Sequence, residues 1–132
     1  MEKDKICKLL IVDDDKFLLD MYCMKFRKGN FEVRGSASGA DALVNMRGGF
    51  IPDILILDLV MPTMSGFQLL ETLKAEHLID KAIVVVLTNQ GQSPDIEKAK
   101  KMGVDGYIVK ASTIPSEVVE QVVKIYGEKK KK

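Results

Sequence analysis

The sequence has little of what soft-metal sites and disulfide frameworks need. Its 132 residues include two cysteines and one histidine. Cys7 and Cys23 lack metal-ligand spacing, and one pair in a chain of this length does not make a disulfide framework. We therefore expect two ordinary buried thiols. His77 has no partner in the sequence, so we expect it at the surface without a catalytic role.

Long apolar runs and an excess of one charge are missing as well. No stretch approaches the roughly 20 apolar residues of a membrane helix, and the opening MEKDKICK is charged where a signal peptide would be apolar. We therefore expect a cytoplasmic protein with no membrane partner. Lys and Arg total 20 against 19 for Asp and Glu, and four of these lysines lie in the last five residues. A body without a basic face is not expected to bind nucleic acid directly.

What the sequence does contain is the alternating apolar pattern of one α/β domain. Size and composition fit a single core, which we place in residues 1–127, followed by a disordered basic tail at 128–132. Continuous apolar runs predict five strands of a parallel sheet, of which the first, third and fourth should be central, at 9–12, 31–34, 54–57, 83–87 and 107–109. Apolar residues at helical spacing predict five helices, at 16–28, 40–46, 67–75, 95–102 and 116–126.

Four of the expected strands end in polar residues that could form a site together. These polar residues are Asp13, Asp14 and Asp15 after the first strand, Asp58 after the third, Thr88 after the fourth and Lys110 after the fifth. The carboxyl ends of parallel strands share one edge of the sheet, where such folds bind ligands. Carboxylates gathered there repel one another, and a bound cation relieves the repulsion. Oxygen ligands without histidine or cysteine favour Mg²⁺. A magnesium ion next to an ammonium and a hydroxyl group indicates a site for a phosphoryl group, with Asp58 available as the nucleophile.

Four stretches of the chain resemble a known family. They are LLIVDDD at 9–15, PDILILDLVMPTMSG at 52–66, VVVLTNQ at 84–90 and GYIVK at 106–110. In this order and spacing they are similar to the signature blocks of response-regulator receiver domains of two-component signalling, which include the chemotaxis response regulator. The resemblance implies a flavodoxin-like three-layer α/β/α sandwich, with five helices and a five-stranded parallel sheet in the order 2-1-3-4-5.

The resemblance also implies a phosphoacceptor site with Mg²⁺ as its cofactor. Asp58 would take the phosphoryl group from a histidine kinase or phosphotransfer protein. Asp14, Asp58 and the backbone carbonyl of Val60 would hold Mg²⁺, and Asp13 would act mainly through metal-bound water. Such a domain is not an enzyme in the usual sense, since it catalyses only its own phosphorylation and dephosphorylation.

A route for the output signal is implied in the same way. Lys110 would pair with the acceptor carboxylate and then with the phosphoryl group, while Thr88 and Tyr107 would form the switch. The signal would leave through the face made by the fourth helix, fifth strand and fifth helix. The partners would be a downstream protein or an output domain missing from this chain, and a phosphorylation-dependent homodimer fits the family.

The sequence departs from the family at Ala111, where a proline usually follows the lysine, often with a cis peptide. A cis bond before a residue other than proline costs about 2.5–4 kcal/mol, so we expect a trans peptide and a displaced loop. The apolar Val60 should alter the access of water to the phosphoryl group, and Gln90 borders the same route. Asp15 lies outside the usual acidic pair, and we expect it to cap the first helix.

Two other functions compete with an active receiver. The first is a pseudo-receiver, a binding module of the same fold that is never phosphorylated, but such modules commonly lose residues of the acidic pair, the acceptor or the lysine. The second is a phosphatase of the haloacid-dehalogenase type, suggested by Asp13 and Asp15. That family expects threonine or valine where this chain has Phe17, and it leaves Asp58 unexplained.

Overall fold

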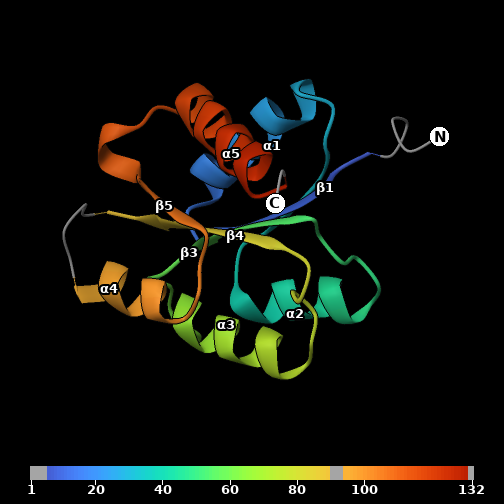
Figure 1. Cartoon of the computed structure of the whole chain (residues 1–132), viewed down its shortest axis with the longest axis vertical. Coiled ribbons are helices and arrows are strands. Elements are labelled where there is room, and N and C mark those ends of the chain that lie inside the picture. The colour runs from blue at the N-terminus through green and yellow to red at the C-terminus, as the bar shows by residue number, and fades with distance from the viewer. Residues whose placement is uncertain (1–5, 90–93, 131–132) are drawn as a thin grey trace.

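A five-stranded parallel sheet forms the centre of the molecule in the computed structural model, which describes residues 6–89 and 94–130. The strands are β1 (Lys8–Val12), β2 (Glu32–Ser36), β3 (Ile54–Asp58), β4 (Ile83–Thr88) and β5 (Gly106–Val109). The helices are α1 (Lys16–Lys28), α2 (Gly39–Arg47), α3 (Gly66–Ala75), α4 (Pro94–Lys101) and α5 (Pro115–Lys130). Helices α1 and α5 cover one face of the sheet, and α2, α3 and α4 cover the other (Figure 1). The strand order is β2-β1-β3-β4-β5, so the expected fold is confirmed.

The three inner strands supply the middle of the core. Every residue of β3 is buried, as are all but the first residues of β1 and β4. Because side chains alternate along a strand, Leu9 and Ile11 pack on the side of α1 and α5, whereas Leu10 and Val12 pack on the side of α2 and α3. The expectation that the first, third and fourth strands are central is confirmed.

Polar caps determine where three of the helices begin. Asp15 caps α1, as expected, and Ser38 caps α2. Each accepts a hydrogen bond from the backbone N–H group of the third residue of its helix. Ser65 and Gln68 form a reciprocal capping box at the start of α3. Each cap satisfies backbone donors that the first helical turn leaves without a partner. The loops after β1 and β3 therefore have defined ends.

Strand β2 lies later in the chain than expected, and this expectation is corrected. The predicted range was 31–34, whereas β2 spans Glu32–Ser36. Gly35 and Ser36 have weak strand propensity, but they continue the ladder opposite Ile11 and Val12 of β1. A Cβ on Gly35 would lie 2.8 Å from Cys23 Sγ, so the glycine lets α1 pack closely on the sheet. Apart from β2 and α5, all boundaries agree with expectation to within one residue.

The C-terminal helix is longer than expected. We predicted a helix over 116–126 and a disordered tail at 128–132, but α5 continues through Lys130. A glycine in a helix interior is only about 1 kcal/mol less favourable than alanine, and the residues after Gly127 are good helix formers. The helix can therefore continue past Gly127. The Lys129 ammonium also lies 3.7 Å from Asp105 Oδ1 at the start of β5. Residues 131 and 132 lie outside the described part of the chain.

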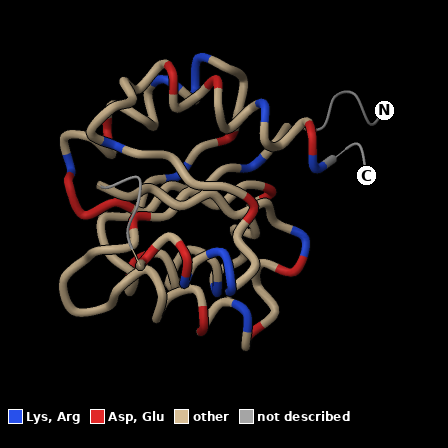
Figure 2. The backbone as a smooth tube through the Cα atoms, turned by 60° about the vertical axis from the view of Figure 1, so that its left-hand side comes forward, with Lys and Arg blue, Asp and Glu red and all other residues tan. Residues whose placement is uncertain are grey.

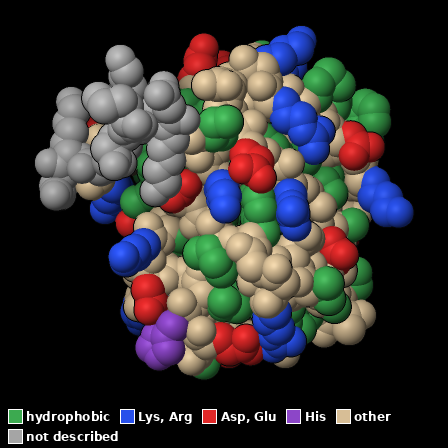
Figure 3. Space-filling view, turned by 90° about the vertical axis from the view of Figure 1, so that its right-hand side faces the viewer, with side chains coloured by type: hydrophobic (Ala, Val, Ile, Leu, Met, Phe, Trp, Pro, Cys, Tyr) green, Lys and Arg blue, Asp and Glu red, His purple; other side chains and the backbone are tan. Residues whose placement is uncertain are grey.

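Two aspartates close the opposite edge of the sheet, where the strands begin. Asp53 Oδ2 accepts a hydrogen bond from Lys8 N, and Asp105 Oδ2 accepts one from Val84 N, each at 2.8 Å. These carboxylates satisfy the backbone donors of the first residue of β1 and the second residue of β4. Figure 3 faces this end of the molecule, where hydrophobic side chains are scattered among charged ones of both signs.

The sequence predicted two buried thiols and a surface histidine, and Cys7 is less buried than predicted. Cys23 is buried and Cys7 partly buried, both without a disulfide, and His77 is exposed beside Asp80. Lys and Arg are interspersed with Asp and Glu along the chain (Figure 2). No helix in the described ranges is long and apolar enough to cross a membrane.

Gly66 is expected to be essential for the turn into α3. A Cβ there would lie 2.4 Å from the Asp58 carbonyl oxygen and 2.8 Å from Leu59 Cα, both backbone atoms of the neighbouring chain segment. Because backbone must move to make room, Gly66→Ala should lower the free energy of unfolding by about 1–3 kcal/mol in urea titrations.

Gly127→Ala is the matched control for this substitution. A Cβ at Gly127 meets nothing within 4 Å, and the residue lies inside α5. The same methyl group should therefore raise the free energy of unfolding by about 0.5–1 kcal/mol. Equal effects of the two substitutions would contradict this account of Gly66.

Candidate functional site

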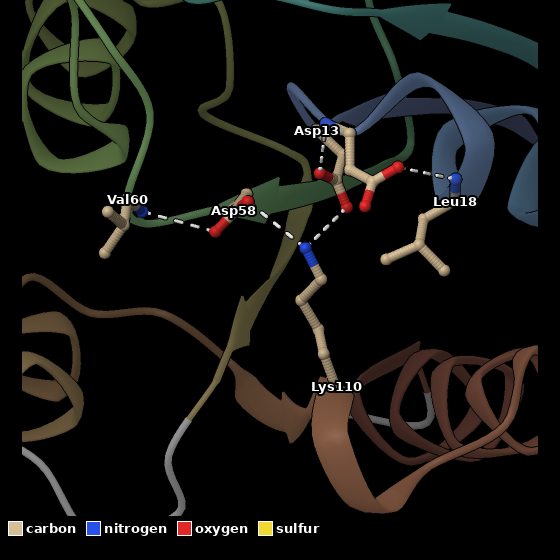
Figure 4. Close-up of polar contacts among 6 residues, drawn as sticks. Asp13, Leu18, Asp58, Val60 and Lys110 are labelled. Carbon is tan, nitrogen blue, oxygen red and sulfur yellow. Dashed lines mark hydrogen bonds and ion pairs between the residues drawn. The ribbon is translucent and has the colours of Figure 1, made fainter.

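Residues from three strands meet at the carboxyl edge of the sheet. Val12 of β1 lies beside Leu57 of β3 in the parallel ladder, so the next residues, Asp13 and Asp58, come out side by side. Lys110, directly after β5, reaches across to both of them (Figure 4). Its Nζ lies 3.0 Å from Asp13 Oδ2 and 3.3 Å from Asp58 Oδ2. One ammonium thus bridges two buried carboxylates.

Asp13 is completely buried although it is ionisable. Its backbone N–H donates to the Ser36 carbonyl at 3.1 Å, and its Oδ1 accepts from Asp15 N at 3.0 Å. Its Oδ2 meets Lys110 Nζ only as an ion pair, and no hydrogen bond of good geometry from the described residues reaches this oxygen. A buried carboxylate oxygen with incomplete hydrogen bonding is well suited to accept a further positive partner.

Asp58 is 5% exposed, and both of its carboxylate oxygens have partners. Oδ1 accepts from Val60 N at 3.2 Å, and Oδ2 meets Lys110. Burial raises the pKa of the Asp58 carboxyl to about 6, although Lys110 and the Val60 N–H act to lower it. The Asp13 charge adds to the effect of burial. Asp58 is therefore a basic carboxylate that is mostly ionised at neutral pH.

Lys110 keeps its charge in spite of its burial. Burial alone would lower the pKa of its ammonium, but the contacts with Asp13 and Asp58 outweigh that effect and raise the pKa. The lysine begins a short 3₁₀ turn, Lys110–Ser112, and none of the described peptides is cis, so the peptide before Ala111 is trans as predicted. The side chain still reaches both carboxylates without a proline after it.

The acidic residues fit a hard divalent cation. One carboxylate oxygen from each of Asp13, Asp14 and Asp58 lies within 4.8 Å of the other two, and Asp14 is exposed at the pocket mouth. All three donors are oxygens, which Mg²⁺ prefers, and Asp13 Oδ2 lacks a well-directed hydrogen bond. The donor set and the incomplete hydrogen bonding both suit Mg²⁺.

An open pocket connects this cluster to solvent. Its lining residues are Asp14, Asp15, Leu18, Asp58, Val60, Asn89, Lys110 and Ala111. Val60 is 65% exposed, so its side chain stands at the pocket rather than in the core. Leu18 and Asn89 were missed by the sequence analysis, although Asn89 directly follows Thr88 at the end of β4 and its position could have revealed it. Gln90 lies outside the described residues.

The two expected switch residues lie on neighbouring strands. Thr88 is buried at the end of β4 and pairs with Val109 of β5 in the ladder, whereas Tyr107, two residues before Val109, is 38% exposed. Tyr107 therefore lies away from the acidic pocket and toward the surface beside α4. The structure brings the carboxylates, Lys110 and Thr88 to one edge and leaves Tyr107 on an adjoining face.

Fold and site together define a doubly wound α/β domain with an acidic pocket, suited to a cation, at the carboxyl edge of its sheet. Residues 9–122 match the family model of the response regulator receiver domain. The chain is 30% identical over 109 residues to the chemotaxis protein CheY of Halobacterium salinarum, covering 83% of this chain and 88% of that protein. It belongs to the response-regulator receiver family.

Two further similarities bear on the length of the chain and on the fold. The chain is 30% identical over 115 residues to the phosphate regulon transcriptional regulatory protein PhoB of Escherichia coli, covering 87% of this chain but 49% of PhoB. It thus spans about half the length of that relative. A putative response regulator structure from Chloroflexus aurantiacus is 32% identical, with a TM-score of 0.81 over 93% of this chain and 99% of that one. Membership of the family makes this a receiver domain of the type found in response regulators.

The raised pKa of Asp58 predicts a pH-dependent stability in metal-free buffer. The carboxyl binds its proton more tightly in the folded state than in the unfolded state, where its value is near 3.8. Ionisation therefore destabilises the fold progressively as the pH rises from about 4 to above 6. Asp58→Asn removes this effect, so with a chelator present the variant should exceed the natural chain in free energy of unfolding by about 1–3 kcal/mol at pH 8.

The same comparison at low pH is the control. Near pH 3 the Asp58 carboxyl is largely protonated in both states, so the advantage of Asp58→Asn should shrink toward zero. Urea titrations at a series of pH values measure the difference. An advantage that stays constant from pH 3 to pH 8 would show that burial does not raise this pKa.

Proposed function

We propose that Asp58 is the phosphoacceptor of this domain and that a histidine kinase or phosphotransfer protein is the donor. The observation that carries the proposal is the Lys110 ammonium 3.3 Å from the Asp58 carboxylate, at the base of a pocket open to solvent. The pocket admits a phosphoryl group to Asp58, and the ammonium can follow the negative charge from the carboxylate to the phosphoryl oxygens.

The transfer itself requires positioning more than acid–base chemistry. An Asp58 oxygen attacks phosphorus, an O–P bond forms, and the N–P bond of the donor phosphohistidine breaks with its electron pair returning to the histidine nitrogen. Val60 N–H holds one Asp58 oxygen and Lys110 the other, so the carboxylate is oriented before the donor arrives. Thr88 at the end of β4 is the hydroxyl proposed to bind a phosphoryl oxygen.

Mg²⁺ is the proposed cofactor of this reaction. Asp14, Asp58 and the Val60 backbone carbonyl would hold it directly, with Asp13 acting mainly through bound water. When bound, it supplies positive charge that neutralises the acidic pocket toward an incoming phosphoryl group. The proposal is supported by the grouping of three carboxylate oxygens within 4.8 Å and by the incomplete hydrogen bonding of Asp13 Oδ2.

The output face is proposed to comprise α4, β5 and α5. Thr88 and Tyr107 belong to adjacent strands, so a shift of Thr88 toward a phosphoryl group at Asp58 can change the space available beside Tyr107. A downstream protein, or an output domain like those of longer relatives, would bind this face in one state of the domain and not in the other.

Labelling at Asp58 tests the acceptor and the cofactor together. The natural chain should gain one phosphoryl group from acetyl phosphate when Mg²⁺ is present, as measured by intact mass spectrometry, and none when a chelator replaces Mg²⁺. Asp58→Asn should abolish the gain. Asp15→Asn is the matched control, because it removes one charge from the same pocket yet keeps an N-cap of equal quality, and it should still be labelled.

Labelling that persists in Asp58→Asn would place the acceptor elsewhere, and labelling without Mg²⁺ would overturn the cofactor assignment. A natural chain that takes up no phosphoryl group under either condition would instead be a pseudo-receiver, which signals by binding alone.

The output face has its own test. Beryllofluoride with Mg²⁺ mimics a phosphoryl group, and at saturation it should shift backbone amide NMR signals at Tyr107 and along α4 as well as at Asp58. The matched reference surface is α2, which packs on the other end of the sheet and should change little. Shifts confined to the acidic pocket would exclude this route for the signal.

A further inference from the structure

Tyr107 occupies an exposed position on the edge strand β5, next to helix α4. Its side chain is 38% exposed, although an aromatic ring buries a large area when it can. Its neighbour Gly106 faces α5, since a Cβ on Gly106 would lie 2.7 Å from Ile125. Because side chains alternate along a strand, Tyr107 faces the α4 side of the sheet, and its position depends on the contacts made there.

Lys100 of α4 supplies one of these contacts. Its Nζ lies 5.5 Å from the centroid of the Tyr107 ring, within the range of an attractive contact between a cation and an aromatic face. The ammonium is also 3.8 Å from Glu97 one helical turn earlier, which holds the lysine along the helix surface. The Lys100 ammonium thus contacts both the Tyr107 ring and Glu97.

A small apolar pocket lies next to the ring. It has a volume of about 220 Å³ and is lined by Val86, Ile96, Ala99, Lys100, Val104, Asp105, Gly106 and Tyr107. This volume is below the range of about 300–1,000 Å³ that is typical of sites for small-molecule ligands, and it suits a single side chain. The ring therefore has two competing environments, the lysine at the surface and the apolar pocket beside β4.

We propose that Lys100 is a positioning residue that holds Tyr107 outward in the resting domain and so sets the balance between the two states of the α4–β5 face. Lys100 touches neither Asp58 nor the acidic pocket, so its effect reaches the phosphoacceptor only through Tyr107. A contact of this kind at an exposed site shifts a two-state balance by about two- to five-fold. Removing the cation should move the ring toward the pocket by that factor.

The direct test observes the tyrosine ring without any phosphoryl chemistry. The full chain is labelled with 3-fluorotyrosine, which gives one ¹⁹F signal for each of its three tyrosines, and Tyr107→Phe assigns the signal of interest. The shift of that signal between H₂O and D₂O reports the exposure of the ring. Lys100→Met keeps the aliphatic stem but removes the charge, so it should move the signal and reduce its solvent isotope shift.

Two variants separate this role from a general loss of charge. Lys98→Met is the matched control, because Lys98 lies on the same helix with its Nζ 4.5 Å from the Phe67 ring, and it should leave the Tyr107 signal unchanged. Lys100→Arg should restore the outward position, since a guanidinium also lies well over an aromatic face. A Tyr107 signal that is identical in the natural chain and in Lys100→Met would overturn the proposal.

A second measurement tests the link to the proposed phosphoacceptor, and it rests on the proposed function. If occupation of Asp58 favours the inward ring, Lys100→Met should bind Mg²⁺–beryllofluoride about two- to five-fold more tightly than the natural chain. Equal affinities, with a ring that has moved, would exclude the coupling. A natural chain that does not bind the mimic would contradict the phosphoacceptor assignment and leave the ring measurement to decide the role of Lys100.

Discussion

The buried contact of Lys110 with Asp13 and Asp58 is the interaction on which the site depends. Two carboxylates side by side at the ends of β1 and β3 repel each other, and desolvation adds to the cost. A protonated lysine between them offsets both effects, and its pKa is raised because the carboxylates favour its charged form. The strand order supplies the geometry, since β1 and β3 are neighbours and β5 ends within reach of both.

This arrangement leaves the pocket short of positive charge. One ammonium faces two buried carboxylates, and Asp14 adds a third carboxylate at the mouth. Burial raises the pKa of Asp58 and the Asp13 charge adds to that effect, while no hydrogen bond of good geometry from the described residues reaches Asp13 Oδ2. A divalent cation would correct the shortage of positive charge, and a phosphoryl group could then approach Asp58 without facing a net negative pocket. Charge balance therefore links the proposed cofactor to the proposed reaction.

The same sheet connects the pocket to a surface that a partner can reach. Thr88 ends β4 at the same edge as the pocket, and the adjacent β5 carries Tyr107 to the side of α4, where Lys100 contacts its ring. Both ends of this connection lie on paired strands, so the proposed signal from Thr88 would pass through packing at one strand boundary. The exposed ring and the small apolar pocket beside it provide the two positions that such a signal requires.

Local patterns in the sequence were sufficient for most of the fold, because a buried parallel strand requires a continuous apolar run and a helix start requires a cap. β1, β3, β4 and the Asp15 cap follow directly from such patterns. β2 and the end of α5 do not, since Ser36 is held in its strand by the ladder to Val12 and Lys129 is positioned beside Asp105 by the packing of α5 on the sheet. In both places a tertiary contact overrides a weak local preference.

The sequence by itself determined which side chains could form the site, because Asp13, Asp58, Thr88 and Lys110 each follow or end a predicted strand and such ends share one edge of a parallel sheet. Only the tertiary structure decided how they meet. Asp13 becomes fully buried while Asp14 beside it stays exposed, and one ammonium contacts two carboxylates that come from distant parts of the chain. The position of Lys100 over Tyr107 was decided in the same way, since it depends on how α4 packs against β5, and no local pattern in the sequence encodes that distance.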